Sequence, residues 1–235
     1  MVRVPARLTG ILERMEHPDV APTELARALA DLARINRFFG GTRVVLEHLD
    51  PWLDRPPSPM RILDVGTGYA DLPRAIVAQA RQRGLAVQID ALDRHSGIRA
   101  LAAHACARYP EIRLRDGDAL ALPYPDRSVD VAIASQLLHH MEGEATVRLL
   151  RELRRVARHA VLVGDLRRGV WPFAATWTVL RLVSRSPLIR HDGPLSIRRG
   201  FVPAELLDLA REAGWTAPRV GRHPFFRLVL TERLG

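Results

Sequence analysis

A short glycine-rich segment has the residue types and spacing of a ligand-binding loop. The chain reads D-V-G-T-G from Asp64 to Gly68, directly after the apolar residues Ile62 and Leu63. Glycines let a backbone approach a bound group closely, and amides at the start of a following helix favour anionic or polar groups. The Asp64 carboxylate, at the end of the predicted strand, is placed to meet a ligand's ammonium group or to order the loop. The segment therefore predicts a nucleotide-type cofactor site.

The spacing after the loop separates two kinds of cofactor. A dinucleotide fingerprint requires a third glycine, but Asp71 stands at that position. A carboxylate there would repel a pyrophosphate, whereas a cofactor without phosphate tolerates it. In this first segment, cofactor contacts are expected from Asp64, Gly66, Thr67, Gly68, Asp71 and Leu72.

Further polar residues follow other predicted strands. Asp93 ends the apolar run 87–92, where an acid can accept both hydroxyls of a ribose. Its alternative role is to cap the helix that begins near Ser96. Ligands gather outside the carboxyl ends of strands in open α/β sheets. The residues expected at such ends are Asp64, Asp93, Asp118, Ser135 and Asp165.

The segment from Gly117 to Val131 makes the signature specific. It reads G-D-A-x-x-L-P-x-x-D-x-S-x-D-V, and L-H-H-M follows from Leu138 to Met141. With the D-x-G-x-G-x-A pattern at the glycine loop, these strings resemble the class I S-adenosylmethionine-dependent methyltransferases. The resemblance is strongest to the ubiquinone/menaquinone-biosynthesis-type small-molecule methyltransferases, and it covers residues 61–168 well.

The resemblance implies a cofactor, a reaction and a set of contacts. S-adenosylmethionine would be the cofactor, S-adenosylhomocysteine the product, and a small molecule the acceptor. Asp118 and Ala119 match the pair that meets the adenine in this family. The remaining cofactor contacts are expected at Arg94, Ser135 and Gln136.

His139 and His140 follow the fourth predicted strand, close to the expected place of the methyl group. A neutral imidazole is well matched to deprotonating a phenol near neutral pH. In related sugar and natural-product enzymes, such a pair acts as the base together with an Asp after the fifth strand, and Asp165 matches that position. Neighbours on a helix point about 100° apart, so one histidine is expected to face the core, and His140 is preferred as the base. Although His139, His140 and Asp165 could bind a divalent ion, no metal is predicted.

Residues 169–200 are predicted to be an inserted cap over the acceptor, with 184–200 irregular. Aromatic residues are concentrated at its start, and they are expected to form the inner wall of a lid over a flat apolar acceptor. A homodimer interface is the alternative use of such an apolar segment. The predicted acceptor contacts are Asn36, Phe39, Trp171, Phe173, Trp177 and Arg198.

The net charge of +9 is unevenly distributed, and all 35 basic residues are Arg. Residues 1–150 hold 19 Arg against 19 acids, whereas residues 151–235 hold 16 against 7. A basic third could bind RNA or an anionic membrane surface. The alternative functions to O-methylation of a small molecule are C- or N-methylation of a small molecule and methylation of RNA or protein. However, Arg151, Arg154, Arg155 and Arg158 alternate with apolar residues, as on a solvated helix face. No N/D-P-P-Y/F motif for base amino groups follows the fourth strand, so no nucleic-acid partner is predicted.

The predicted fold is α/β, a Rossmann-like, seven-stranded, mostly parallel sheet with helices on both faces. The expected parts are N-terminal helices and a linker (1–60), the cofactor-binding core (61–168), the cap (169–200) and closing elements (201–235). Four prolines between 51 and 59 mark the linker. The lone Cys106, together with the lack of a signal sequence or a membrane-length apolar run, predicts a cytoplasmic protein.

Overall fold

Seven strands form one sheet in the order β3-β2-β1-β4-β5-β7-β6, which confirms the predicted α/β class. The computed structural model describes residues 4–17, 19–53 and 57–234. β1 to β5 are parallel, and β7 is antiparallel to both β5 and β6. The strands are β1 Met60–Val65, β2 Val87–Leu92, β3 Ile112–Arg115, β4 Val129–Ser135, β5 Ala157–Leu166, β6 Arg219–His223 and β7 Arg227–Arg233.

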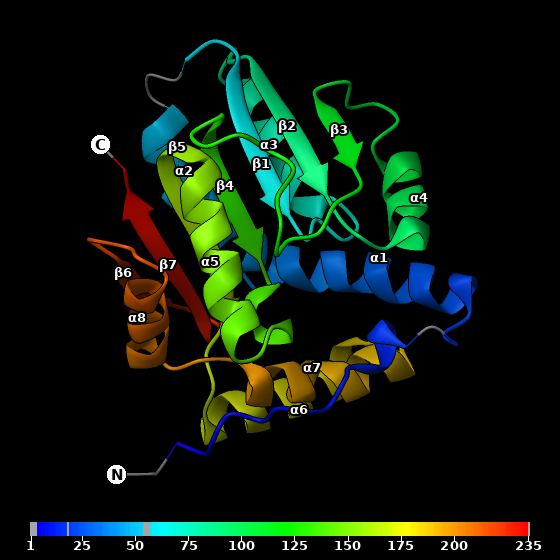
Figure 1. The fold of residues 1–235 in the computed structure, drawn as a ribbon. Helices are drawn as coiled ribbons and strands as arrows, with labels where there is room; N and C mark the ends of the chain where they lie inside the picture. Colours follow the sequence, from blue (N-terminus) through cyan, green and yellow to red (C-terminus); the bar gives the residue numbers. More distant parts are fainter. Residues whose placement is uncertain (1–3, 18, 54–56, 235) are drawn as a thin grey trace.

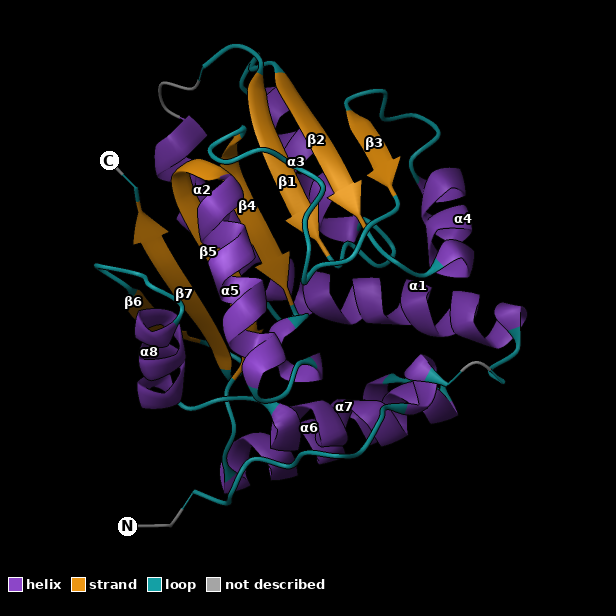
Figure 2. Cartoon of the chain, viewed as in Figure 1, coloured by secondary structure: helices purple, strands orange, loops and turns teal. Residues whose placement is uncertain are grey.

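Helices cover both faces of this sheet and also its carboxyl edge (Figures 1 and 2). α5 and α8 lie on one face, α2 and α3 on the other, while α1, α6 and α7 lie beyond the carboxyl ends of the parallel strands. The helices are α1 Pro22–Phe38, α2 Gly41–Leu53, α3 Asp71–Gln82, α4 Ser96–Ala105, α5 Glu144–Val156, α6 Val170–Val183, α7 Pro187–Arg199 and α8 Pro203–Glu212, with short 3₁₀ turns η1 Arg14–Glu16 and η2 Leu138–His140.

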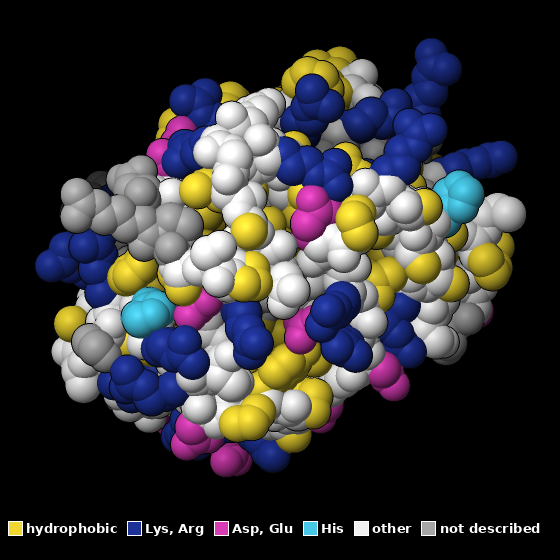
Figure 3. Space-filling view, turned by 90° about the horizontal axis from the view of Figure 1, so that it is seen from above, with side chains coloured by type: hydrophobic (Ala, Val, Ile, Leu, Met, Phe, Trp, Pro, Cys, Tyr) yellow, Lys and Arg dark blue, Asp and Glu magenta, His cyan; other side chains and the backbone are white. Residues whose placement is uncertain are grey.

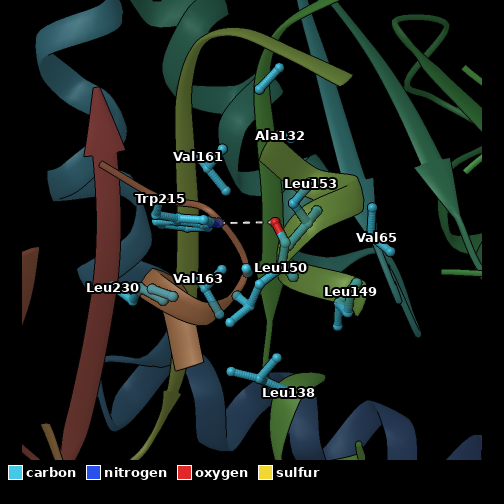
Figure 4. Packing of buried hydrophobic residues seen from close by; sticks show 14 of the residues in the cluster. Val65, Ala132, Leu138, Leu149, Leu150, Leu153, Val161, Val163, Trp215 and Leu230 are labelled. Carbon is cyan, nitrogen blue, oxygen red and sulfur yellow. Dashed lines mark hydrogen bonds between the residues drawn. The ribbon is translucent and has the colours of Figure 1, made fainter. Parts of the chain in front are cut away.

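The central strands are apolar on both sides because both sides are covered. Every residue of β4 from Val129 to Ala134 is buried, as is typical of a parallel strand between two helical layers. On one face, Leu150 and Leu153 of α5 belong to the same buried cluster as Val163 of β5 and Trp215 (Figure 4). The Trp215 indole Nε1 also donates to the Leu150 carbonyl at 3.1 Å. This hydrogen bond satisfies the one polar atom of a large buried side chain.

The prediction that 184–200 is irregular is wrong, because α7 occupies most of this segment. Pro187 lies in the first turn, where a proline has no helical hydrogen bond to lose, and the helix continues through Pro194. A Cβ on Gly193 would lie 2.1 Å from the Leu180 side chain, so glycine is what lets α7 approach α6 this closely. The inserted segment is therefore a pair of packed helices.

The N-terminal segment, residues 4–17, runs along this helix pair before α1 (Figure 1). The Leu8 amide donates to the Arg198 carbonyl at 3.0 Å, and Arg7 Nε donates to the Arg199 carbonyl at 2.7 Å. In the predicted linker, α2 continues to Leu53, and residues 54–56 lie outside the described residues. No helix within 4–17, 19–53 and 57–234 is long and apolar enough to cross a membrane.

Gly164→Ala should destabilise the fold, because α2 packs directly on β5 at this residue. The new Cβ would lie 2.9 Å from Val45 Cγ2, which is closer than carbon atoms normally approach. We expect a loss of about 1–3 kcal/mol in the free energy of unfolding, measured by urea denaturation. Val45→Ala removes the clashing methyl groups, so the double variant should lose less than the sum of the two single variants. Additive losses would show that this contact does not limit the packing.

Candidate active site

One cavity of about 920 Å³ lies at the carboxyl edge of the parallel strands. The loops after β1, β2 and β4 form one side, and α1, α6 and α7 form the other. Leu25, Leu29 and Leu32 of α1 make part of the far wall apolar. All the predicted cofactor contacts line this cavity, namely Asp64, Gly66, Thr67, Gly68, Asp71, Leu72, Asp93, Arg94, Asp118, Ala119, Ser135 and Gln136.

The glycine loop turns tightly between β1 and α3. Gly66 and Gly68 have φ angles of 69° and 54°, in the left-handed region that glycine adopts without strain. A Cβ on Gly66 would lie 2.8 Å from the Leu137 side chain, so the loop also needs glycine to pass this residue. Behind the loop, burial raises the pKa of Asp64 to about 7. The neighbouring hydroxyl Oγ1 of Thr67 is buried, and Thr67 opposes this rise in the pKa.

Asp93 holds the same loop from the end of β2. Its Oδ2 accepts from the Gly68 amide and its Oδ1 from the His95 amide, both at 2.9 Å. Each carboxylate oxygen has a second lone pair, so these bonds leave room for the predicted hydrogen bonds from ribose hydroxyls. Asp118 Oδ1 accepts from the Leu120 amide at 2.9 Å, which orders the loop after β3.

Two imidazole–carboxylate pairs lie side by side at the cavity. His139, His140 and Glu16 line it, whereas Asp165 lies behind His139 and does not. His139 Nδ1 lies 2.8 Å from Asp165 Oδ1, and the His139 amide donates to Asp165 Oδ2 at 3.0 Å. His140 Nδ1 lies 2.6 Å from Glu16 Oε1, and the two imidazole centroids are 4.1 Å apart. His139 is buried, whereas His140 is half-buried.

Both carboxylates beside the histidines are ionised near neutral pH. Burial alone would raise the pKa of Asp165, but the interaction with the His139 imidazole and the hydrogen bonds from the His139 and Leu166 amides outweigh it, and the pKa is lowered. Burial opposes ionisation of Glu16 too, yet its hydrogen bond to His140 and its other donors lower the pKa to about 2. An ionised carboxylate on Nδ1 fixes the tautomer in which Nε2 carries the lone pair. Each pair is thus arranged to present a basic Nε2.

The N-terminal segment supplies part of this wall, which the sequence did not indicate. Glu13 is buried, accepts from Ser196 Oγ at 2.6 Å, and places Oε1 3.6 Å from His139 Nε2. Arg199 Nη1 donates to Glu16 at 3.0 Å. The only signal was a pair of acids three residues apart, and that spacing is common on solvated turns. Contacts with residues more than a hundred positions away give these acids their role in the site.

Glu13, His139 and His140 also place ligand atoms within 4.8 Å of one another. The set considered from the sequence contained Asp165 in place of Glu13, but Asp165 is bound to Nδ1 of His139. Two imidazoles and a carboxylate are a donor set that divalent transition metals accept. The set that brings metal-ligand atoms together is therefore Glu13, His139 and His140, and it differs from the one considered from the sequence.

The structure brings only two of the predicted acceptor contacts, Asn36 and Phe39, to the cavity. The prediction of an aromatic inner wall is wrong. Trp171, Phe173 and Trp177 do not line the cavity, and Trp171 is 73% exposed. α6 is apolar on all sides, so its sequence did not specify which face turns inward. Leu180 packs against Gly193 of α7 and fixes that choice. The lining face of α6 consists of Ala175, Thr176, Val179 and Leu180.

Arg198 is likewise exposed and does not line the cavity, whereas its neighbour Arg199 does. Consecutive residues on a helix point about 100° apart, so a shift of one position moves the side chain from solvent into the site. Arg199 is buried, and its Nε and Nη2 donate to the carbonyls of His139 and His140, both at 3.2 Å. It therefore holds the turn that carries both imidazoles.

Residues 62–160 match the family model described as "Methyltransferase domain". The chain is 32% identical over 184 residues to a demethylmenaquinone methyltransferase of Roseiflexus castenholzii, covering 70% of this chain and 71% of that protein. A putative S-adenosyl-L-methionine-dependent methyltransferase of Methanococcus maripaludis superposes with a TM-score of 0.67 at 13% identity, over 97% of this chain and 98% of that one. Human N-acetylserotonin methyltransferase, solved with S-adenosylmethionine, gives a TM-score of 0.65 at 17% identity, over 92% of this chain and 57% of that one.

The stability of the Asp64→Asn variant, relative to that of the wild type, should increase as the pH rises. Folded Asp64 keeps its proton up to about pH 7, whereas the unfolded chain loses it near the ordinary value of 3.8. Between these values the unfolded state binds fewer protons, so this group lowers the free energy of unfolding as pH increases. Asn cannot ionise. The difference in urea-unfolding free energy, variant minus wild type, should therefore grow from about pH 4 to about pH 7, and a difference independent of pH would contradict the raised pKa.

Proposed function

Because the chain belongs to the class I S-adenosylmethionine-dependent methyltransferases, in the group that includes the demethylmenaquinone methyltransferases, we propose that it methylates a hydroxyl group of a small apolar acceptor. The acceptor class is an aromatic or polyketide-like natural product or a quinol precursor. One observation carries the proposal. The His139–His140 turn, with a carboxylate on each imidazole, lies in one cavity between the glycine loop and the apolar wall of α1.

The residues around the glycine loop fit the cofactor of this family. Gly66 and Gly117 both line the cavity, and neither position has room for a side chain. A Cβ on Gly117 would lie 2.6 Å from the Leu92 side chain, and one on Gly66 would lie 2.8 Å from that of Leu137. The Thr67 hydroxyl is buried beside Asp64, and Thr67 lines the cavity where a polar group of the cofactor would lie. S-adenosylmethionine supplies a methyl group on a sulfonium, which needs only a nucleophile held in line. Asp64, Asp71, Asp93 and Asp118 are the carboxylates proposed to hold the cofactor.

We assign the base role to His140. His139 has carboxyl groups near both ring nitrogens, Asp165 at Nδ1 and Glu13 at 3.6 Å from Nε2. His140 has only Nδ1 engaged, by Glu16, and its Nε2 has no hydrogen-bond partner among the described residues. A hydroxyl proton would pass to this Nε2 as the oxygen attacks the methyl group, and the ionised Glu16 would stabilise the resulting imidazolium. His139, bound to Asp165, then positions its neighbour.

The basic C-terminal third offers little to a nucleic-acid backbone. Many of its Arg side chains are engaged within the chain, including Arg154 with Glu232, Arg158 with Asp130, Arg168 with Glu205, and Arg211 with Asp208. On the face shown in Figure 3, Arg side chains are interrupted by acidic, apolar and uncharged atoms. A groove for single strands would instead combine a continuous basic track with exposed aromatic residues. Small-molecule methylation is therefore the function we propose over RNA methylation.

His140→Ala should lower kcat by about 10²–10⁴-fold while leaving S-adenosylhomocysteine affinity nearly unchanged. The wild-type rate should rise with pH, because only the neutral imidazole can accept the hydroxyl proton. His139→Ala should lower kcat less and should not remove that pH dependence, because its proposed role is positional. Both variants can be assayed with radiolabelled cofactor on a panel of phenols.

Full activity in both single variants would contradict base catalysis and favour a carbon nucleophile or an acceptor that is already ionised. A chelator tests whether catalysis depends on a metal instead, since Glu13, His139 and His140 could hold a divalent ion. If EDTA abolished turnover and a divalent metal restored it, the free-imidazole mechanism would be wrong. Turnover unchanged by EDTA is the result we expect.

Val179→Trp should block the acceptor region of the cavity. Val179 lines the cavity from α6, so an indole there fills space that an apolar acceptor would occupy. We expect at least about a tenfold loss of kcat/KM, with S-adenosylhomocysteine affinity within about twofold of wild type, since a misplaced acceptor loses rate steeply. Trp171→Ala, on the outer face of the same helix, is the matched control and should leave both values unchanged. If Trp171→Ala lowered kcat/KM and Val179→Trp did not, the prediction that aromatic residues of α6 form the acceptor wall would be supported instead.

A further inference from the structure

Arg227 is a buried cation that the reaction proposed above does not use. It is the first residue of β7, which begins at the carboxyl edge of β5, and its side chain lines the cavity. The residue is only 8% exposed. Nη1 donates to Gln136 Oε1 at 2.8 Å, and Nη2 contacts Asn36 Oδ1 at 3.5 Å. The third donor, Nε, is buried without a partner.

Two neutral amides do not neutralise this guanidinium. Asp165 attracts it through space, but no ion pair joins the two, and the Asp165 oxygens accept from His139 and from the Leu166 amide. Burial lowers the pKa of Arg227 to about 10, a sign that the charged form is poorly solvated. A buried charge with an unused donor needs an anion of the right shape, and a carboxylate matches the guanidinium fork.

Carboxyl groups, which an ammonium group would hold in the ionised form, face the same cavity nearby. Asp64 and Asp71, at the two ends of the glycine loop, both line it. Asn36 connects the two regions: its Oδ1 faces Arg227, and it also acts on Asp71, where burial raises the pKa of the carboxyl group and Asn36 opposes that rise. A cation and carboxylates joined through one amide are complementary to an amino-acid zwitterion, which carries a carboxylate and an ammonium on one carbon.

Gly41 keeps space open around this group. Although its backbone angle is ordinary, a Cβ there would lie 3.1 Å from Asn36 Oδ1 and 3.4 Å from Cζ of Arg227. A side chain at the start of α2 would thus press on both polar groups. The joint between α1 and α2 is built around the pair.

We propose that Arg227, supported by Gln136 and Asn36, binds the carboxylate of the cofactor's methionine moiety, while Asp64 and Asp71 face its ammonium group. The positively charged sulfonium of the cofactor repels another cation. We therefore place the guanidinium at the carboxylate end of the cofactor's methionine moiety, away from the sulfonium. The assignment rests on the cofactor of the family and not on which atom of the acceptor is methylated.

Two ligands that differ in the amino-acid end test the assignment without any acceptor. S-adenosylhomocysteine carries the zwitterion, whereas 5′-methylthioadenosine lacks it and keeps the adenosine and the sulfur. Calorimetry on Arg227→Met should show S-adenosylhomocysteine binding about 10–100-fold weaker, the scale of a lost charged hydrogen bond, with 5′-methylthioadenosine within about twofold of wild type. Arg227→Lys should lose less. Arg222→Met, an exposed position on β6, is the matched control and should change neither.

Retained binding of 5′-methylthioadenosine also demonstrates that the variant is folded. Equal weakening of both ligands would overturn the proposal, because it would mean that Arg227 only supports the cavity wall. Unchanged affinity for both would overturn it as well, and would leave the guanidinium for a carboxylate on the acceptor. Because no acceptor is present, failure of the hydroxyl-methylation proposal cannot produce either result.

Discussion

The Asp165 carboxylate is the group on which the arrangement of the cavity depends. It is fully buried in β5, where a charge is costly, and it is stabilised by the imidazole and amide of His139 and by the Leu166 amide. These bonds tie the turn after β4 to the neighbouring strand. The same turn carries His140, whose position fixes Glu16 and, through Arg199, the end of α7. Removing one buried partner would leave an uncompensated charge, so the contacts form as a set.

The sequence predicted the cofactor side well because topology alone brings those residues together. In a parallel sheet all carboxyl ends meet at one edge, so residues after β1, β2 and β4 must be neighbours wherever the strands are identified correctly. Asp64, Asp93 and Ser135 needed no knowledge of side-chain packing. The match of the glycine loop, together with residues 117–131 and 138–141, to a known family then made the cofactor specific.

The acceptor side could not be predicted in the same way. α6 is apolar around its whole circumference, so its period does not distinguish Trp171 on the outside from Val179 on the inside. The choice depends on a contact between Leu180 and Gly193, which lie on different helices. Glu13 depends on Ser196, which is 183 residues away, and local spacing carries no trace of such a partner. Nothing in the sequence distinguishes Arg227 from the other Arg residues. Only the fold shows that its strand begins beside the cavity.

The two halves of the cavity differ in how they are attached to the chain. The cofactor side belongs to the sheet, whereas Glu13 and Glu16 lie on a segment of extended chain and one 3₁₀ turn, held to α7 and to the turn after β4 mainly by hydrogen bonds, among them Arg7 to the Arg199 carbonyl and Ser196 to Glu13. Contacts of this kind open with a much smaller free energy than a buried strand does. Loss of the N-terminal segment from α7 would uncover His140 while β1 to β5 stay intact. On heating or in denaturant, catalytic activity should therefore be lost well before circular dichroism shows any loss of secondary structure.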